Sequence, residues 1–386
     1  MFFELSRTEI ILLCVSGFFF LIQLFYLLVY YAEPLWYQKR KIRGNDFPAG
    51  TTPSVSVIVC SQNESENLKR FLPSILEQNY PQYEVIVIND GSTDESDEVL
   101  GILEKQYKHL YRTYIPEEAK HISRKKLAMT IGIKAARYDY LIFTEPPCEL
   151  IGPDWIRSMS RNFSGDKTIV LGFSPLSKST GLKTKFAAYD NLINGLQYLS
   201  LAIKNHPYRG VGRNMGYKKS HFFEHKGYAK FMHLRAGEDD LFINQIATPD
   251  NVAVEISEDS LATMHLDDFR IWEEIRLCQS TTQKFYKKGP VAFWRFESWS
   301  RVFFWSALLC LGICGWPQLF SPVVALGLFL IRSLTQILVI NKAGKMLHVE
   351  HFYSTLLLFD FFQPVFDVYI AVCRLIRGEK DYIWRG

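Results

Sequence analysis

The apolar residues of this chain follow different patterns at its ends and in its middle. Ile10–Tyr31 is an uncharged run that is long enough to span a bilayer, which takes roughly 20 residues. Val302–Ile340 carries one charge, Arg332, and is interrupted by Pro317 and Pro322, which predicts two spanning helices joined by a tight turn. In between, short apolar runs alternate with amphipathic stretches, as in domains where strands and helices alternate.

Basic residues predict how the chain is oriented in the membrane. Four of them lie between positions 39 and 43, after the first apolar run, whereas only Arg7 precedes it. The positive-inside rule then places the middle of the chain in the cytoplasm. We therefore expect an integral membrane protein, in the inner membrane if the source is bacterial. Its parts would be an anchor over residues 1–45, a cytoplasmic domain over 46–290 and a membrane region over 291–386. A cleaved signal peptide is disfavoured because the run is too long and lacks a small-residue cleavage site.

The last apolar stretch, Phe352–Cys373, has a mixed pattern. Asp360, Gln363 and Asp367 share one face of the predicted helix. Such a polar stripe suits an in-plane or groove-packed helix better than a fourth span exposed to lipid. Arg332 would fall near the middle of its span, where an unpaired charge is costly. We expect its side chain to snorkel to the interface rather than pair with a lipid phosphate.

The middle of the chain begins with the pattern of two buried parallel strands. Val55–Cys60 and Glu84–Asn89 are apolar runs separated by a helical segment, Glu64–Gln78, which Asn63 could cap. Two parallel strands joined by a helix bring their carboxyl ends to one edge of a sheet, where open α/β sheets bind ligands. At that edge Asn63, Glu64 and Asp90 can hydrogen-bond a base and a ribose.

The remaining elements complete an α/β domain with a mostly parallel sheet. A closing hairpin is expected from Val252–Ile256 with Leu261–His265, and Phe269–Lys288 reads as an amphipathic helix at the membrane surface. The other predicted elements are strands at His109–Ile115, Tyr138–Thr144 and Thr168–Phe173, and helices starting at Thr93 or Asp94 and spanning Arg124–Arg137, Leu182–Lys204 and Asp239–Ala247.

Composition excludes several classes of function. The chain has 386 residues, with 44 Lys+Arg against 40 Asp+Glu. The net charge of +4 is too balanced for a nucleic-acid partner, and no basic stripe is present. The seven cysteines are scattered, which indicates reduced thiols and neither a disulfide framework nor a zinc site.

The run Pro53–Ser96, with Asn63, Glu64 and Asp90 at the predicted sheet edge, resembles the opening of family 2 glycosyltransferases. The resemblance extends to about Lys288. It implies a GT-A fold, which is Rossmann-like, and a nucleotide-sugar donor. It also implies that Asn63, Glu64 and Asp90 bind the donor. For Glu64 an alternative is a plain helix-terminal carboxylate, which the helix dipole stabilises.

A basic segment and an altered motif follow. Lys125 matches a family lysine near the donor, although three consecutive cations at 124–126 are nearly as compatible with a solvated basic face. The family usually has Thr-Asp-Ala-Asp where this chain has Thr144-Glu-Pro-Pro147. The Asp motif binds a divalent cation such as Mg²⁺ or Mn²⁺ across the donor phosphates, and Pro147 takes the place of its principal ligand.

Three outcomes follow from this substitution. Glu145, with Glu149 or His265, could hold a metal in a shifted geometry. Cations such as Lys125 or Arg213 could neutralise the diphosphate without metal. Alternatively, the chain could bind a donor without turning it over.

The acidic motif Glu238-Asp239-Asp240 resembles the family's Glu-Asp pair at the start of a helix. The resemblance implies that Asp239, or Asp240 in a shifted register, takes the acceptor proton in an inverting transfer. An acidic cluster that only stabilises the helix is the alternative. The Gly-rich stretch with Gly212 and Asn214 resembles a family segment that faces the acceptor.

The sequence thus predicts an inverting glycosyltransferase of glycan or glycolipid synthesis with a nucleotide-sugar donor and a membrane-associated, lipid-linked or glycan acceptor. The Gln-x-x-Arg-Trp signature of processive synthases is absent, which argues against a long-chain polymerising enzyme. The alternative is a non-catalytic membrane subunit that binds nucleotide sugar, because Pro146-Pro147 replaces the metal motif.

Overall fold

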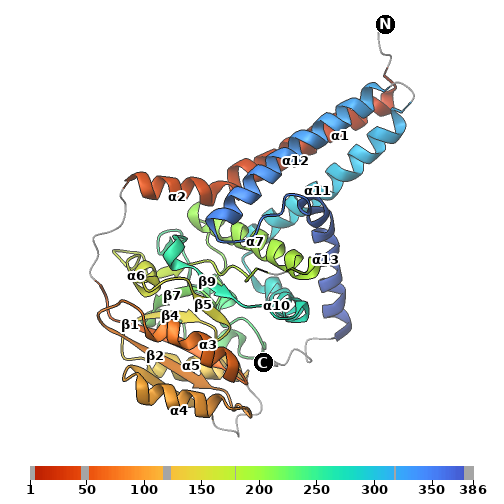
Figure 1. Ribbon diagram of the computed structural model, residues 1–386. Coiled ribbons are helices and arrows are strands. Elements are labelled where there is room, and N and C mark those ends of the chain that lie inside the picture. The colour runs from red at the N-terminus through yellow and green to blue at the C-terminus, as the bar shows by residue number, and fades with distance from the viewer. Residues whose placement is uncertain (1–4, 45–51, 116–122, 179, 317–318, 378–386) are drawn as a thin grey trace.

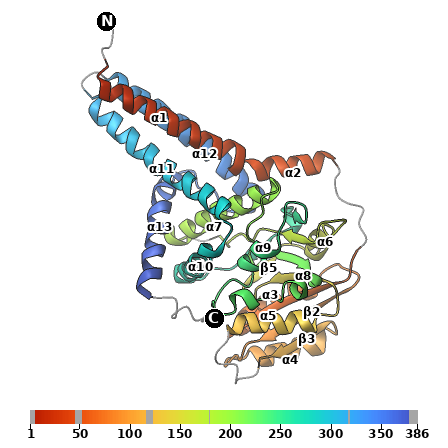
Figure 2. The ribbon, with the colours of Figure 1, turned by 180° about the vertical axis from the view of Figure 1, so that it is seen from behind.

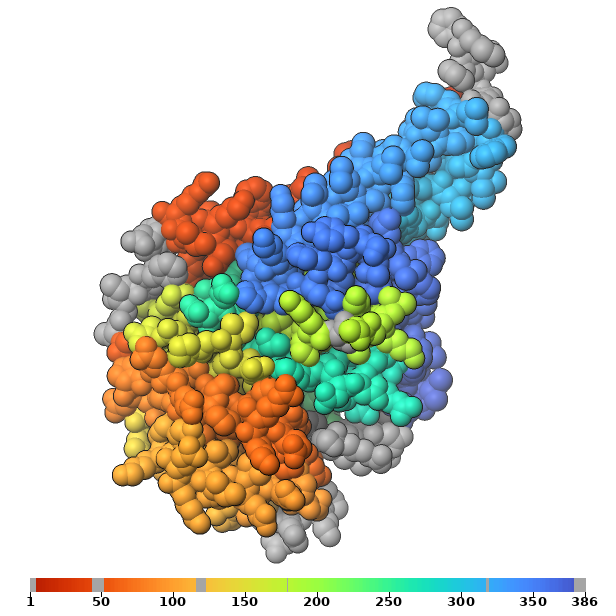
Figure 3. Space-filling view, in the orientation of Figure 1, coloured from red at the N-terminus to blue at the C-terminus, as the bar shows by residue number. Residues whose placement is uncertain are grey.

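The structure is a computed structural model that describes residues 5–44, 52–115, 123–178, 180–316 and 319–377. Figure 1 shows an α/β domain from which a bundle of long helices, α1, α11 and α12, projects to one side. Helix α13 runs beside the α/β domain and does not join the far end of the bundle, as the view from behind in Figure 2 also shows. In the space-filling view of Figure 3 the bundle stands clear of the rest of the molecule.

A seven-stranded mixed sheet forms the centre of the α/β domain. Its strand order is β3-β2-β1-β4-β7-β6-β8. The contiguous block β3-β2-β1-β4 is parallel throughout, whereas β7 is antiparallel to both β4 and β6. The strands are β1 (Val55–Ser61), β2 (Tyr83–Asn89), β3 (Leu110–Tyr114), β4 (Tyr140–Thr144), β6 (Ile169–Leu171), β7 (Met215–Lys218) and β8 (Val252–Val254). The predicted α/β class with a mostly parallel sheet is confirmed.

The inner strands of the parallel block, β1, β2 and β4, are almost entirely buried because helices cover them. Every residue of β1 is buried, as expected for a parallel strand with two covered faces. Helices α3 (Ser65–Leu76) and α4 (Ser96–Gln106) contact each other, and α5 (Arg124–Ala135) contacts β1 and β2. Helix α5 lies so close to the sheet that a Cβ on Gly132 would be 2.5 Å from the Ile88 side chain.

The predicted hairpin between Val252–Ile256 and Leu261–His265 is wrong. Strand β8 pairs in parallel with β6, whereas β9 (Ala262–Met264) pairs with β5 (Cys148–Leu150) in a separate two-stranded sheet. The buried carboxylate of Glu255 fixes the end of β8 because it pairs with Lys41 at 2.9 Å and Arg161 at 3.1 Å. A 3₁₀ turn at Glu258–Ser260 then leads the chain into β9, which pairs with β5.

The remaining helices surround the sheet and form the bundle. Within the α/β domain they are α6 (Trp155–Ser160), α7 (Leu182–Ile203), α8 (Lys219–Glu224), α9 (Asp240–Ile246) and α10 (Phe269–Thr282), which is followed by the 3₁₀ turn Gln283–Phe285. The others are α1 (Arg7–Phe25), which continues through a π-helical segment (Tyr26–Tyr31) to α2 (Glu33–Gly44), and α11 (Lys288–Cys314), α12 (Phe320–Met346) and α13 (Leu356–Arg377).

Among the described residues, three helices are long and apolar enough to cross a membrane: Arg7–Arg43, Phe320–Met346 and Leu356–Arg377. Helix α11 packs along both α1 and α12. The two long helices predicted within Val302–Ile340 are present as α11 and α12, although α11 begins well before the apolar run.

The prediction that Arg332 snorkels is wrong, because its side chain is only 1% exposed inside the protein. Its guanidinium pairs with Asp360 at 2.9 Å and also bonds Gln23 of α1 and Gln336. Asp360 pairs in addition with Arg301 of α11 at 3.2 Å. The polar stripe of α13 therefore faces protein groups, which agrees with a groove-packed helix.

Breaking this buried network should destabilise the fold. Asp360→Asn leaves the guanidinium groups of Arg332 and Arg301 without their shared carboxylate, at an expected cost of about 3–5 kcal/mol. We expect a clearly lower Tm of the full chain in detergent. The matched control, Arg112→Gln, breaks the solvent-accessible pairs with Asp97 and Glu104, where about 1 kcal/mol or less is at stake. Equal Tm shifts in the two variants would contradict this role of the network.

Candidate active site

The carboxyl ends of β1, β2 and β4 bring three predicted site residues to one edge of the sheet. Glu64 follows β1, Asp90 follows β2 and Glu145 follows β4, and the strands are in register there. Asn63 does not cap α3 as predicted. Its backbone is left-handed (φ 54°), and its Oδ1 accepts a bond from the Thr93 amide at 2.8 Å. Asn63 therefore joins the loop after β1 to the loop after β2.

Two carboxylates at this edge are poorly solvated. Asp90 is fully buried, and its Oδ1 accepts a 2.6 Å bond from Nε of Arg124. Its Oδ2 is buried without a hydrogen-bond partner among the described residues. Burial raises the pKa of Asp90, although Arg124 opposes the shift. Burial likewise raises the pKa of Glu64, whose Oε2 accepts a bond from Asn67.

The basic segment 124–126 is not a solvated face. Lys126 is fully buried, and its ammonium donates to the backbone carbonyls of Leu234 and Ala236. Burial lowers the pKa of Lys126 to about 8. The Ser123 hydroxyl also donates to the carbonyl of Arg235 at 3.0 Å. The start of α5 thus holds the loop that leads into the acidic motif.

Lys125 joins the sheet edge to the acidic motif directly. Its Nζ lies 2.9 Å from a carboxylate oxygen of Glu145 and 2.9 Å from one of Glu238. Burial alone would raise the pKa of Glu145, but Lys125 and then Arg213 outweigh it, and the pKa is lowered. Because Arg124 and Lys125 are neighbours in the sequence, the backbone at the start of α5 links the ion pair of Asp90 to the ion pairs of Glu145 and Glu238.

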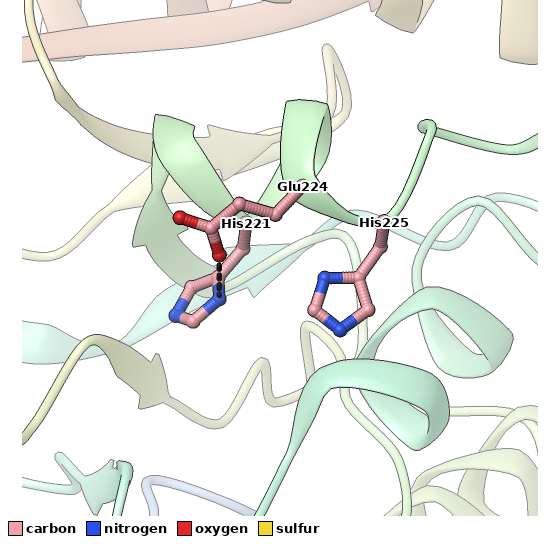
Figure 4. A group of neighbouring side chains, drawn as sticks. All are labelled: His221, Glu224 and His225. Atoms are coloured by element: carbon pink, nitrogen blue, oxygen red, sulfur yellow. Dashed lines mark ion pairs between the residues drawn. The ribbon is translucent and has the colours of Figure 1, made fainter.

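The residues at the altered metal motif do not converge on a common point. Glu145 is engaged by Lys125, whereas exposed Glu149 pairs with His265 at 2.8 Å on the β5–β9 sheet. Within the described part of the chain, the group of ligand atoms spaced for a metal is instead His221, Glu224 and His225 (Figure 4). The side chains at 145–149 therefore do not fit the metal site of the Asp motif, and no step below is assigned to a metal.

The acidic motif separates into three different environments. Asp239 is the N-cap of α9, and its oxygens accept 2.7 Å bonds from the amides of Gly212 and Asp240. Asp240 is buried and accepts bonds from the hydroxyls of Thr282 and Tyr286, so it faces away from Asp239. Glu238 bonds Lys125 through Oε1, and its buried Oε2 has no hydrogen-bond partner in the described region.

Burial raises the pKa of Asp239 well above the ordinary range, and the charges of Asp240 and Glu238 add to this rise. A carboxylate with a raised pKa is a stronger base near neutral pH. Gly212 permits the contact with Asp239, because a Cβ at Gly212 would lie only 3.3 Å from Oδ2.

The side chains of Asn214 and Arg213 differ in how fully they are hydrogen-bonded. The Asn214 amide donates to the carbonyls of Phe173 and Ser260 and accepts from the indole of Trp155, so all of these bonds are made within the core. Arg213 is buried, with Nε unbonded. Sequence analysis missed Arg124 as a partner of Asp90 and Tyr286 as a partner of Asp240, because no local pattern links residues so far apart in the chain.

Comparisons with known proteins agree with this arrangement. Residues 56–225 match the family model "Glycosyl transferase family 2". The poly-beta-1,6-N-acetyl-D-glucosamine synthase of Staphylococcus epidermidis is 33% identical over 89 residues, which are 23% of this chain and 20% of that protein. The putative glycosyltransferase EpsH of Bacillus subtilis is 27% identical over 132 residues, 34% of this chain and 36% of that protein. The matches thus span about a fifth to a third of these relatives.

A solved structure shares the fold over nearly the whole chain. The mannosyltransferase PcManGT from Pyrobaculum calidifontis, in complex with GDP-Man and Mn²⁺, aligns with a TM-score of 0.57 at 16% identity, covering 94% of this chain and 99% of that one. Residues 56–225 are therefore similar to the glycosyl transferase family 2 domain, and the chain has a GT-A-like α/β fold.

Proposed function

We propose that this protein is a membrane-anchored, inverting glycosyltransferase that moves a sugar from a nucleotide-sugar donor to a membrane-associated, lipid-linked acceptor in glycan or glycolipid synthesis. The observation that carries the proposal is the chain of contacts from Asp90 through Arg124 and Lys125 to Glu238. It brings the nucleotide-side carboxylate and the acidic motif to one edge of a domain that matches family 2 glycosyltransferases.

The donor would lie along the carboxyl ends of the parallel strands. Glu64 would accept hydrogen bonds from a base or a ribose, and the unbonded oxygen of Asp90 would do so once the side chains that bury it move aside. Lys125 and Arg213 are the cations nearest Glu145, and they supply positive charge where the diphosphate would develop negative charge. Phosphate oxygens would compete with Glu145 and Glu238 for Lys125.

Asp239 would act as the base in one displacement step. The acceptor hydroxyl oxygen attacks the anomeric carbon, and its proton passes to Asp239. The bond between the anomeric carbon and the diphosphate oxygen breaks, and its electron pair leaves with the nucleoside diphosphate. A single displacement inverts the anomeric centre and needs one base, which matches one half-buried carboxylate of raised pKa facing Gly212.

The acceptor class rests on the long helices. Three are apolar enough to cross a membrane, and α10 packs against one of them, α13, while Tyr286 just beyond α10 bonds the acidic motif. The positive-inside pattern supports a cytoplasmic domain. Relatives named for polysaccharide synthesis support a glycan product.

A non-catalytic subunit is the second candidate, because Pro147 replaces a ligand of the family's metal motif.

The two candidates differ in their response to Asp239→Asn. If the chain is an enzyme, this variant should lose transfer by about 10²- to 10⁴-fold and still bind nucleotide. Transfer from a panel of UDP- and GDP-sugars would be measured with the full chain in membranes, with Mg²⁺, Mn²⁺ or a chelator.

Asp268→Asn is the matched control, because Asp268 also caps a helix, α10, through a backbone amide but lies outside the site. It should retain activity. Full turnover by the Asp239→Asn variant would refute the assignment of the base. Nucleotide binding without turnover by the unmodified chain under every metal condition would favour the scaffold.

The pH dependence should report the electrostatics around Asp239. The base must be deprotonated, so kcat/KM should rise with pH through its raised pKa. Glu238→Gln removes a like charge and should move this limb to lower pH. Lys125→Met removes a cation that lowers the pKa, so the limb should move to higher pH. The measured quantity is the pH at which kcat/KM rises, and not the maximum value that kcat/KM reaches. Shifts in the same direction for both variants would refute Asp239 as the titrating group.

A further inference from the structure

A cavity of about 460 Å³ lies at the junction of α7, α10, α11 and α13. In Figures 1 and 2 these helices meet where the bundle joins the α/β domain. The cavity contains neither Asp90 nor Asp239 in its lining. Its charged lining consists of two carboxylates, Glu297 and Asp367, and five arginines: Arg209, Arg276, Arg295, Arg301 and Arg374.

Two of the arginines balance the carboxylates, and a third donates to the backbone. Arg276 pairs with Asp190 and Asp367. Arg301 pairs with Glu297 and Asp360. Arg374 donates to the backbone carbonyl of Ser280 at 2.6 Å. Arg209, Arg295 and Arg374 form no ion pair with a carboxylate among the described residues, and the five arginines exceed the four paired carboxylates by one positive charge.

Arg209 is the most informative of them. Its residue is only 7% exposed, its Nε is buried without a hydrogen-bond partner, and no carboxylate pairs with it among the described residues. Its guanidinium lies over the ring of Tyr198 at 5.5 Å, a contact worth far less than a lost ion pair. The charge of Asp240 acts on Arg209 from beyond ion-pair distance, and Asp240 already accepts bonds from two hydroxyls. An anionic ligand in the cavity would give the buried guanidinium a direct ion pair.

The rim of the cavity is apolar. Trp299, Val302 and Val368 line it and are exposed by 61%, 38% and 63%. Trp299 and Val302 lie on α11, which packs in the bundle, and Val368 lies on α13, which is apolar enough to span a membrane. Tryptophan is favoured at membrane interfaces. The ligand should therefore combine an anionic head with an apolar body.

The cavity also approaches the acidic motif through Tyr286. Tyr286 lines the cavity, and its hydroxyl donates to Asp240. Asp240 is bonded through its backbone amide to Asp239. A ligand in the cavity is thus separated from the candidate base by two side chains.

We propose that this cavity binds the phosphate or diphosphate group of a lipid acceptor, with Arg209 as its main ligand and Arg295 as a second. Guanidinium groups suit phosphate because they donate paired bonds in a fixed plane. The identification of the lipid as an acceptor rests on the proposed function. Free phosphate shares the head-group chemistry, and the experiment separates the two sources.

The test uses three probes on the full chain in a neutral detergent: hexyl phosphate, inorganic phosphate and hexanol. Binding is followed by tryptophan fluorescence, since Trp294 and Trp299 line the cavity. Hexyl phosphate should bind more tightly than inorganic phosphate, and hexanol should show no saturable binding. Arg209→Gln should weaken hexyl phosphate binding by about tenfold or more. Arg270→Gln, on α10 but outside the lining, should leave it unchanged.

Arg295→Gln changes an exposed residue, so it keeps the test decisive if the Arg209 variant does not fold, and it should weaken binding severalfold. The proposal is overturned if neither variant weakens binding, if hexanol binds as well, or if inorganic phosphate binds equally. Arg209-dependent binding without donor turnover would refute the proposed function but not the cavity. Transfer to a lipid acceptor with unchanged kinetics in Arg209→Gln would refute the cavity alone.

A second inference comes from α8, on the outside of the sheet. The Nδ1 atoms of His221 and His225 are both buried and have no hydrogen-bond partner in the part of the chain that the structure describes, and Glu224 Oε2 lies 3.8 Å from Nδ1 of His221. All three ligand atoms lie within 4.8 Å of one another (Figure 4). Nε2 of His221 bonds the hydroxyl of Thr168 at 2.7 Å. Such a bond to the far nitrogen orients metal-binding histidines.

We infer that His221, His225 and Glu224 bind a transition-metal ion such as Zn²⁺, for which two imidazoles and a carboxylate are suitable ligands. Co²⁺ titration of the full chain, stripped with a chelator and free of nucleotide, tests this through its visible absorption bands. His225→Gln should weaken binding by about tenfold or more, whereas His206→Gln, an exposed histidine elsewhere, should not. Absence of the bands, or equal affinity in both variants, would overturn the site.

Discussion

The ammonium group of Lys125, placed between the carboxylates of Glu145 and Glu238, is the contact on which the site depends. Glu145 ends a central strand, whereas Glu238 precedes α9, which lies almost a hundred residues later in the chain. One cation between two anions holds these segments together and leaves a single negative charge in excess. Buried Lys126 reinforces the join by bonding two carbonyls of the preceding loop. Asp239 owes its position at the sheet edge to this pair of lysines.

The turn after β4 explains how the chain tolerates a lost metal ligand. The Cys148 amide donates to the carbonyl of Glu145 at 3.0 Å, so Pro146 and Pro147 occupy the centre of a hydrogen-bonded turn. Proline fixes φ and limits the unfolded ensemble, so the turn holds the Glu145 backbone firmly. The carboxylate is then positioned for Lys125 and lies in the field of Arg213. Lys125 and Arg213 thus place positive charge beside the carboxylate that remains at this position.

The sequence predicted those parts that depend on local patterns. The strands β1 and β2, the long α7 and the α11–α12 pair follow from apolar runs and breakers. The wrong predictions share a different cause. The separation of β8 from β9 depends on Glu255, which forms ion pairs with Lys41 and Arg161 from distant parts of the chain. Arg332 is buried because it forms an ion pair with Asp360, and the sequence does not show this pair because Asp360 lies on another helix. The ion pair between Asp90 and Arg124 could not be predicted either, because an ion pair between two elements produces no periodic pattern in the sequence.

In the proposed reaction, two sets of buried charges separate a donor side from a membrane side. On the donor side, Lys125 and Arg124 are matched by carboxylates, so a diphosphate would have to displace an existing partner to bind them. On the membrane side, no carboxylate forms a direct ion pair with Arg209 among the described residues. Tyr286 and Asp240 connect the two sides through hydroxyl–carboxylate bonds. An anion that neutralises Arg209 would remove a cation that now stabilises the charged form of Asp240. Occupancy of the membrane side would thereby alter the electrostatic setting of the neighbouring candidate base, so the two halves of the proposed reaction are coupled through one carboxylate.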